Sequence, residues 1–406
     1  MDELTQIARA RAAVLGLPTQ ALEDWRYVRC ETLKEAAYDG QRALTAEEHN
    51  RFVQPHQPGL VWVDGQLQPR ASDSWPVTWQ DAPELADQGT ALAEEQDHAV
   101  VWAFCARESA GESAGESAGE STGGTPTALR ISGDAGSPLH LTNIATGGTS
   151  GWSLVVDVAP GTRLELVIRH IALGKARSCP AITLRLGHAA QAQVSEVQAS
   201  SWHHLLATAT LEVAADAQAQ WTSVAQGGAC VRLTTRATLT GRGAHLALAG
   251  LAEVRDRDQA HHLVRVVHAA GHTTSEQLFK SILHDRAQTS FDGLVQIRSG
   301  CDGADATQQN RNLVLSDLAK ADTRPQLDIK ADDVKAAHGA TVGQLDADEL
   351  FYLRCRGLLR QDAEKLLTIG FIGEVLARLP HRQALDSLLG SLLGDKAAPP
   401  QSKAAP

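Results

Sequence analysis

Apolar and polar residues alternate with a period of two through most of the middle of the chain. From about residue 127 to about residue 340, short segments carry an apolar side chain at every second position, as in residues 152–158, 164–168, 182–186 and 209–213. This period is typical of β-strands with one buried face. We therefore predict a core built from many short strands.

The strands follow one another at short intervals with little helical signal between them. Such a pattern fits a sandwich, a barrel or a solenoid. The region is long for one sandwich, and it has few of the Asn-Gly or Asp-Gly pairs that antiparallel hairpins favour. A mainly β fold of the parallel β-helix type, in which each coil covers the next, is the preferred interpretation.

The first part of the chain shows helical patterns and one strand pattern. Residues 4–8 place apolar side chains one helical turn apart, and residues 22–26 indicate a second short helix. Residues 60–63 indicate a strand that enters a tight turn at Asp64-Gly65. This part is expected to be mainly helical.

The last part of the chain is predicted to be helical. Asp346, followed three residues later by Glu349, resembles a capping box, and Gly357 is a stop signal. A second helix is expected to end before Gly370, and a third is expected over residues 385–392.

A low-complexity segment lies between the N-terminal part and the strands. Its Glu-Ser-Ala-Gly repeat is too polar to bury the apolar surface that would offset its ordering entropy. The predicted organisation is an N-terminal mainly helical domain (1–105), a low-complexity loop or linker (106–126), a parallel β-helix core (127–345), a C-terminal helical domain (346–394) and a disordered tail (395–406).

The bulk composition narrows the possible partners and compartments. The 406 residues include 37 Lys plus Arg and 48 Asp plus Glu, so the net charge is −11. That balance argues against non-specific binding to nucleic acid or to anionic membranes. The start of the sequence resembles no secretory signal, and six scattered cysteines without a C-x-x-C pair fit a reducing compartment. We expect a cytoplasmic protein with no nucleic acid or membrane partner.

Common catalytic motifs are missing from the sequence. It contains no G-x-x-x-x-G-K-S/T, no G-x-G-x-x-G and no H-E-x-x-H, and its G-x-S-x-G matches fall only inside the low-complexity Glu-Ser-Ala-Gly repeat. We therefore expect no nucleotide site of its own and no common hydrolase chemistry.

A cluster of four histidines and one single histidine are candidates for metal binding. His261, His262, His268 and His272 lie close together in the sequence, and clustered imidazoles bind zinc, iron or nickel. Their spacing matches no known ligand set, so ordinary structural histidines are the favoured interpretation. His338 precedes a glycine at the junction between the strands and the terminal helices, where a glycine allows close backbone approach.

Several segments in the last third of the chain carry a family resemblance. The run from Ser275 to about Leu379 resembles the SufD branch of the SufB/SufD family of iron–sulfur cluster assembly proteins, and residues 25–27 look like that family's N-terminal motif. The matching pieces are residues 275–280, 291–293, 307–313, 321–325, 331–335, 338–343 and 350–357.

The resemblance implies a fold and a set of partners. The fold would be a right-handed parallel β-helix flanked by N-terminal and C-terminal helical parts. The chain would be a non-catalytic scaffold subunit that pairs with a SufB paralogue and holds a SufC ATPase on its C-terminal helices. Sulfur would reach SufB from a cysteine desulfurase system, and a transient iron–sulfur cluster would form at the shared interface.

The resemblance also implies site residues. The family's His-Gly-Ala-Thr motif falls on His338, which would bind iron or the nascent cluster, with Gly339, Ala340 and Thr341 beside it at the SufB interface. The expected interface residues on the terminal helices are Phe351, Tyr352, Arg356 and Gly357.

The chain departs from the family pattern at one position near this motif. Many relatives have a cysteine where this chain has Ala336, so a thiolate from this loop is in doubt. Cys301 and Cys355 are expected to be buried structural residues. Whether a flavin binds, and whether the chain forms homodimers alone, stays open.

Two other functions remain as alternatives at this point. A carbohydrate-active β-helix enzyme would need paired carboxylates in a groove, and Asp302, Asp305, Asp332 and Asp333 are the available acids. These acids fall in polar turns, where solvation is the simpler explanation. The other alternative is a stand-alone metal-binding solenoid.

Overall fold

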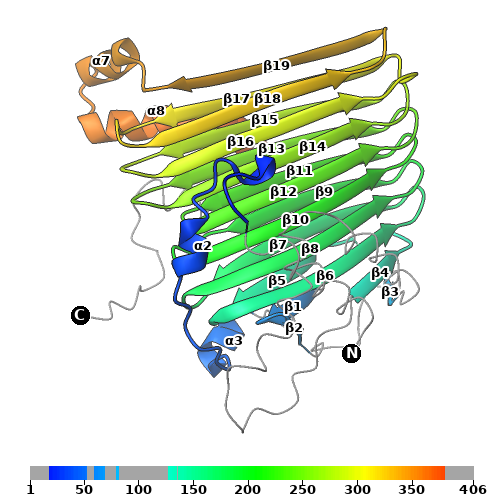
Figure 1. Ribbon diagram of the computed structural model, residues 1–406, viewed down its shortest axis with the longest axis horizontal. Coiled ribbons are helices and arrows are strands. Elements are labelled where there is room, and N and C mark those ends of the chain that lie inside the picture. The colour runs from blue at the N-terminus through cyan, green and yellow to red at the C-terminus, as the bar shows by residue number, and fades with distance from the viewer. Residues whose placement is uncertain (1–17, 53–58, 69–78, 82–126, 135, 380–406) are drawn as a thin grey trace.

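The computed structural model describes residues 18–52, 59–68, 79–81, 127–134 and 136–379. Two sheets face each other, and the chain passes from one to the other at every coil (Figure 1). Their strands pair in parallel, except for one antiparallel pair at the N-terminal edge of each sheet. The parallel β-helix predicted from the sequence is confirmed. The strands of sheet 1 are β1 (Gly59–Val63), β2 (Gln66–Leu67), β5 (Leu139–Ala145), β7 (Arg163–Ala172), β9 (Gln191–Gln198), β11 (Gln218–Gln226), β13 (His245–Val254), β15 (Thr274–Leu283), β17 (Ala304–Val314) and β19 (Val334–Gly343). Those of sheet 2 are β3 (Trp79–Asp81), β4 (Thr127–Ile131), β6 (Gly148–Val158), β8 (Ala176–Leu186), β10 (His203–Val213), β12 (Cys230–Leu239), β14 (Gln259–His268), β16 (Gln288–Ile297) and β18 (Lys320–Ile329).

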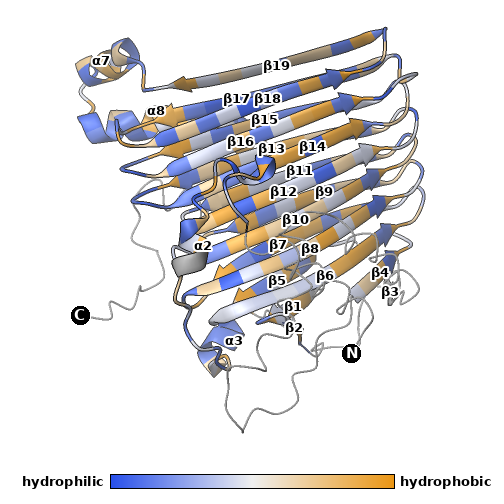
Figure 2. Ribbon diagram, in the orientation of Figure 1, coloured by the Kyte–Doolittle hydropathy of each residue, from blue (hydrophilic) through white to orange (hydrophobic). Residues whose placement is uncertain are grey.

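The core fills the space between the two sheets, which we call the lumen. Equivalent residues of successive coils stack in register, as in the column Leu164, Ala192, Ala219 and Leu246. Apolar and polar positions alternate along the strands (Figure 2), and the inward apolar rows merge into one buried cluster along the solenoid. The period-two pattern of the sequence therefore specifies which side chains line the lumen.

The N-terminal part is mixed in its described residues. It contains the short helices η1 (Glu23–Trp25), α2 (Glu31–Glu35) and α3 (Ala46–Phe52), as well as strands β1 to β3. The tight turn predicted at Asp64-Gly65 is confirmed, because both residues have positive φ angles of 49° and 82° and join β1 to antiparallel β2. Strand β1 pairs with β5, so the solenoid begins before residue 127. The helix predicted over residues 4–8 lies outside the described residues.

Residues 18–35, which we call the N-terminal strap, cross the outer face of sheet 2 (Figure 1). Trp25 and Cys30 are buried there against apolar side chains of β8, β10 and β12. The guanidinium of Arg232 lies 4.1 Å from the centroid of the Trp25 ring, and Arg232 itself is only 1% exposed. A segment far away in the sequence therefore covers this face.

The outer face of sheet 1 is covered by the second of two terminal helices, α7 (Ala347–Cys355) and α8 (Arg360–Leu376). The predicted end of the second helix before Gly370 is wrong, because α8 continues through it. Ile372 and Val375 are fully buried against β13 and β15, and this burial offsets the helix penalty of about 1 kcal/mol that a glycine carries. The helix predicted over residues 385–392 and the tail lie outside the described residues. No described helix has the length and apolar content needed to cross a membrane.

Five histidines in the strands are kept neutral by burial. Desolvation lowers the pKa of His203 and His261 to about 3 and the pKa of His204, His262 and His268 to about 4. Unfolded histidines titrate near a pKa of about 6.5, so the unfolded chain binds more protons below that pH. The stability that these groups permit is complete above pH about 6.5 and is lost as the pH falls towards 4.

We predict that the free energy of unfolding falls between pH 6.5 and 5, by about 1 kcal/mol per buried histidine. Asp258 opposes this trend, because burial raises its pKa to about 6. The variant His262→Leu should reduce the slope of unfolding free energy against pH by about a fifth. The control His188→Gln should leave it unchanged, because the side chain of His188 is 66% exposed. Denaturant unfolding at several pH values measures how the free energy of unfolding changes with pH in each variant. A free energy that does not change between pH 6.5 and 5 in the parent chain would contradict the prediction.

Candidate functional site

The solenoid has an open end at its last coil. Strand β19 pairs with β17, and β18 pairs with β16, and each is the terminal strand of its sheet among the described residues (Figure 1). Each therefore presents one free edge of backbone N–H and C=O groups. The residues of β19 are mostly exposed, in contrast to the buried strands beneath it. This open end is where a further strand can add to each sheet.

His338 lies in the middle of β19 at this open end. It is in register with Gln308 of β17, and its neighbour Ala336, two residues earlier, packs against the lumen core. His338 therefore belongs to the inward-facing row of β19. Its side chain is exposed, since no further coil of the described chain covers it. The junction position expected from the sequence is confirmed.

Three amide side chains on β17 form a polar floor beneath β19. Gln308 and Asn310 are each 1% exposed and Asn312 is 4% exposed. Gln308 Nε2 donates to Gln277 Oε1 at 2.9 Å, Asn310 Nδ2 donates to the Phe279 carbonyl at 3.3 Å, and Asn312 Nδ2 donates to Asn310 Oδ1 at 2.7 Å. Sequence reasoning missed this floor. The available signal was a run of amides at alternate positions of a buried strand.

The outer face of β18 is linked to the strap by charged groups. Arg324 of β18 lies 2.7 Å from Glu23 of the strap and 3.3 Å from Asp292. The same Asp292, which is 4% exposed, pairs with Arg265 at 2.9 Å, and Arg265 pairs with Asp24 at 2.7 Å. A buried carboxylate held by two arginines is costly to disrupt. The strap therefore fixes the outer face of this terminal strand.

Apolar side chains are exposed on the terminal helices beside the open end. Phe351 is 66% exposed and Tyr352 is 57% exposed on α7. Arg356 donates to the Tyr352 hydroxyl at 2.8 Å, and its guanidinium lies 4.9 Å from the ring centroid. Asp346 caps α7 by accepting from the backbone of Glu349, and Gly357, with φ at +93°, follows its end, as predicted.

A groove of about 900 Å³ separates these helices from the coil turns. Its charged lining residues have both signs, with Arg255 and Lys365 near Asp317 and Glu364. Glu364 accepts from Arg360 at 2.8 Å. A mixed, open surface of this kind fits contact with a protein better than enclosure of a small substrate.

Comparison with known proteins supplies the family. Residues 143–371, more than half of the chain, match the family described as "SUF system FeS cluster assembly, SufBD core domain". The chain belongs to the SufB/SufD family.

Curated relatives agree with this family assignment. The chain is 29% identical to the iron-sulfur cluster assembly protein SufD of Escherichia coli K12 over 375 residues, which is 90% of this chain and 86% of that protein. It is 48% identical to a SufBD family protein of Synechocystis over 30% of this chain and 26% of that protein. A SufBD family protein of Mycobacterium leprae is 32% identical over 47% of this chain and 50% of its own length.

The motif residues next to His338 lie on the exposed part of β19. A Cβ added to Gly339 would meet nothing within 4 Å, so no close contact within the described chain requires this glycine. Ala340 is in register with Asn310, and the Thr341 carbonyl accepts from Asn312 Nδ2 at 3.1 Å. The expected interface role of Gly339, Ala340 and Thr341 stays a prediction for this SufB/SufD chain.

The histidines clustered between residues 261 and 272 do not form a metal site among the described residues. His261 faces the strap and lies 2.7 Å from Ser290, whereas His262 faces the lumen with its ring centroid 5.0 Å from that of Phe279. His268 lies 2.7 Å from the Thr273 hydroxyl. Within the described residues, no three His, Cys, Asp or Glu side chains are placed to hold a metal ion. The structural interpretation of these histidines is supported.

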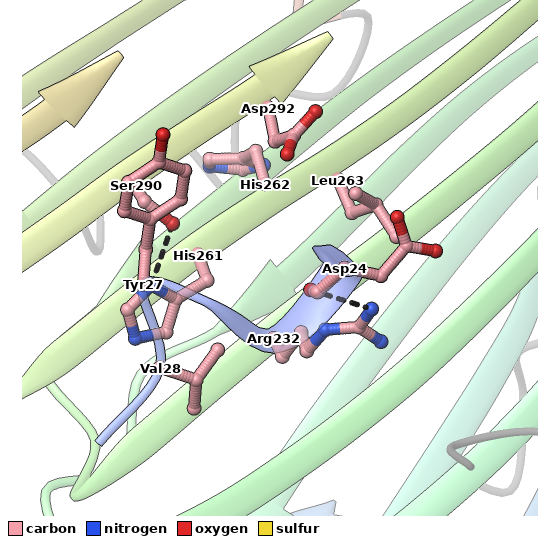
Figure 3. Close-up of a pocket in the computed structure, with 9 residues that line it drawn as sticks. All are labelled: Asp24, Tyr27, Val28, Arg232, His261, His262, Leu263, Ser290 and Asp292. Carbon is pink, nitrogen blue, oxygen red and sulfur yellow. Dashed lines mark hydrogen bonds between the residues drawn. The ribbon is translucent and has the colours of Figure 1, made fainter. Parts of the chain in front are cut away.

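Figure 3 shows the surroundings of His261 and His262. Between the strap and β14 remains a pocket of about 10 Å³, room for about one water molecule. The strap residues Asp24, Tyr27 and Val28 close it from outside. A substrate therefore has no space there.

A second polar feature of the lumen was missed by sequence reasoning. The imidazole of His170 lies 3.0 Å from Glu196 Oε1, and Trp221 Nε1 donates to Glu196 Oε2 at 3.1 Å. On the other side, Asn143 Nδ2 lies 3.3 Å from His170 Nδ1, while Asn143 Oδ1 accepts from Trp152 Nε1 at 3.0 Å. Each member of this buried network has a partner, which lets polar groups lie among apolar coils.

The remaining candidate acids and cysteines differ in their positions. Asp305 lies within β17, so its predicted place in a polar turn is wrong, because that strand already begins at Ala304. Asp302 accepts the backbone N–H groups of Asp332 and Asp333 at 3.3 Å each, so it stabilises a turn.

Cys301 is buried, as expected. Cys355 is exposed on α7, so its predicted burial is wrong. The reason is that α7 buries no residue of its own and stands beside the solenoid.

Proposed function

We propose that this chain is a SufD-like scaffold subunit of the SUF machinery that pairs, through its open end, with a SufB paralogue. His338 then supplies an imidazole to iron or to a transient iron–sulfur cluster at the shared interface. The observation that carries the proposal is the free edge of β18 and β19 with His338 exposed on the inward row of β19.

The chemistry of the ligands supports a shared site. Iron in clusters is held mainly by cysteine thiolates, and imidazole replaces thiolate in some clusters. This chain has alanine at position 336, so the loop brings an imidazole and no thiol of its own. A partner with cysteines would complete the ligand set. Sulfur would arrive on that partner from a cysteine desulfurase system.

The open end also has apolar groups that pairing would cover. Val342 on β19 is 53% exposed and Ile329 on β18 is 41% exposed. Both continue inward rows that are buried in the coils beneath. A second solenoid end that adds strands to both sheets would bury these side chains and satisfy the free backbone groups.

The terminal helices are the proposed docking surface for the SufC ATPase. Leu359 is 73% exposed and Leu366 is 50% exposed, so they extend the apolar surface of Phe351 and Tyr352. Helix α8 is anchored on sheet 1, where Lys280 pairs with Glu374 at 3.0 Å. Movement of an ATPase on these helices would therefore act on the solenoid and open the interface, with ATP hydrolysed by the partner.

The alternatives have less support. A carbohydrate-active enzyme needs free paired carboxylates, whereas Asp302 is engaged in a turn. A stand-alone metal-binding solenoid has no ligand cluster in the described part of the chain. The cytoplasmic location, a non-catalytic role and possible self-pairing of the isolated chain remain parts of the proposal.

We expect His338→Ala, co-purified with SufB and SufC partners, to assemble normally. Its iron and acid-labile sulfide content after anaerobic reconstitution should fall by at least about tenfold, the effect that even outer-shell changes at metal sites reach. The matched control is His188→Ala, a histidine at a turn with a side chain 66% exposed. Normal iron and sulfide in the His338 variant would refute the ligand role, and loss of assembly would make the residue structural.

We expect Val342→Asp to weaken pairing with SufB, because it places a charge where an exposed apolar side chain becomes buried at the proposed interface. The isolated variant should keep its melting temperature, since the side chain is exposed there. Trp202→Asp is the control, because Trp202 is 64% exposed at a turn away from the open end. Size-exclusion chromatography with light scattering measures the pairing, and equal pairing of both variants would place the interface elsewhere.

We expect Phe351→Ser to reduce SufC binding without changing SufB pairing. Truncating an exposed aromatic anchor at an interface costs about 2 kcal/mol or more, which is roughly a thirtyfold loss of affinity. Leu67→Ser, 38% exposed near the opposite end of the solenoid, is the control. Isothermal titration with the ATPase gives both affinities, and an unchanged value for Phe351→Ser would remove α7 from the docking surface.

A further inference from the structure

Gln308 has a buried acceptor atom with no partner directly beneath His338. The side chain is 1% exposed, and its Oε1 accepts no hydrogen bond from the described residues. Leaving a buried acceptor unpaired costs about 1–3 kcal/mol. Neighbouring strands lie about 4.8 Å apart, so in-register side chains on one face are within reach of each other. The nearest in-register side chain above Gln308 is the exposed imidazole of His338.

The Gln308 amide contacts the deeper Gln277 amide, whose own Nε2 has no hydrogen-bond partner among the described residues. Gln308 Nε2 donates to Gln277 Oε1 at 2.9 Å. Gln277 is itself 3% exposed and belongs to the same inward column, one strand deeper. Because the nitrogen is engaged there, the oxygen is the atom left for a neighbour on β19.

The same chain already contains this arrangement once, at the other end of the lumen. Asn143 is in register with His170 on the neighbouring strand, and its amide nitrogen lies 3.3 Å from His170 Nδ1. There the Asn143 amide oxygen accepts from Trp152 Nε1, so the amide nitrogen is the atom that donates to His170 Nδ1. The ring proton of His170 therefore belongs on Nε2, which faces Glu196. An in-register amide thus selects the tautomer of the imidazole above it.

At the open end the unpaired amide atom is the oxygen of Gln308, so the expected tautomer of His338 is the reverse of that of His170. Building on the proposed role of His338, we propose that Gln308 is a positioning residue: its Oε1 accepts the Nδ1 proton of His338 and leaves the lone pair of Nε2 free for a metal. Rotation of the exposed imidazole about its side-chain bonds makes this contact. The pair presents Nε2 away from Gln308, towards the edge where the second chain is expected.

An amide suits this position better than a carboxylate. A metal-binding histidine usually donates its other ring N–H to an acceptor that fixes its orientation. A carboxylate at position 308 would put a charge among buried groups, whereas the amide oxygen accepts the proton while remaining neutral. Gln308 therefore orients the imidazole at no cost in buried charge.

The test is the ring-nitrogen NMR spectrum of the full-length chain with ¹⁵N-labelled histidine, in which the His338 signals are identified by their loss in His338→Gln. In the parent chain Nδ1 should carry the proton and Nε2 should not. Gln308→Leu, which removes the acceptor oxygen, should lose this preference. Gln309→Leu is the control, because Gln309 is exposed on the opposite face of the same strand. In the partnered complex, Gln308→Leu should weaken iron binding by about 10- to 100-fold.

The outcomes separate the positioning role from the proposed function. Protonation of Nε2 in the parent chain, or the same tautomer in Gln308→Leu, would overturn the role of Gln308 whatever His338 does. A tautomer that depends on Gln308, together with normal iron and sulfide in His338→Ala, would support the contact and reject the ligand role of His338.

Discussion

The in-register stacking of parallel coils is the constraint on which the rest of the structure depends. Each inward side chain lies on its equivalent in the coil below, so every coil buries its neighbour and supplies its backbone partners. The same rule creates the chemistry of the last coil. Where the stack ends, the described part of the chain leaves the inward rows and free edges of β18 and β19 without a cover, and His338 belongs to the row on β19. The candidate site is thus the unfinished surface of a repeating structure.

The sequence predicted the features that depend on local periodicity. Alternation identified the strands and their buried faces, and the capping residue Asp346 and Gly357 marked the limits of α7. Motif matches drew attention to His338 as a family position. These patterns can be read from the sequence because each one spans only a few residues, and the strand alternation recurs in every coil of the solenoid.

What the sequence did not predict depends on contacts between distant residues. The strap reaches Arg265 and Arg324 from positions 23 and 24, and no local pattern in a strand shows such a partner. Helix α8 passes through Gly370 because sheet 1 buries its far half. Gln308 looked like an ordinary polar residue until the register placed it beneath His338. Tertiary burial overrides local preference in each case.

The free edges of β18 and β19 could pair with a paralogue or with a second copy of the same chain. Backbone groups on a strand edge bind any strand of suitable direction, so they do not distinguish a paralogue from another molecule of the same chain. Discrimination must therefore come from side chains along the edge, among them Lys320 and Asp328, through attraction to one partner and repulsion of the other. Under the proposed pairing, a few charges would set the ratio of the pair with the paralogue to self-pairs, and relative expression levels would have only to supply enough of each subunit.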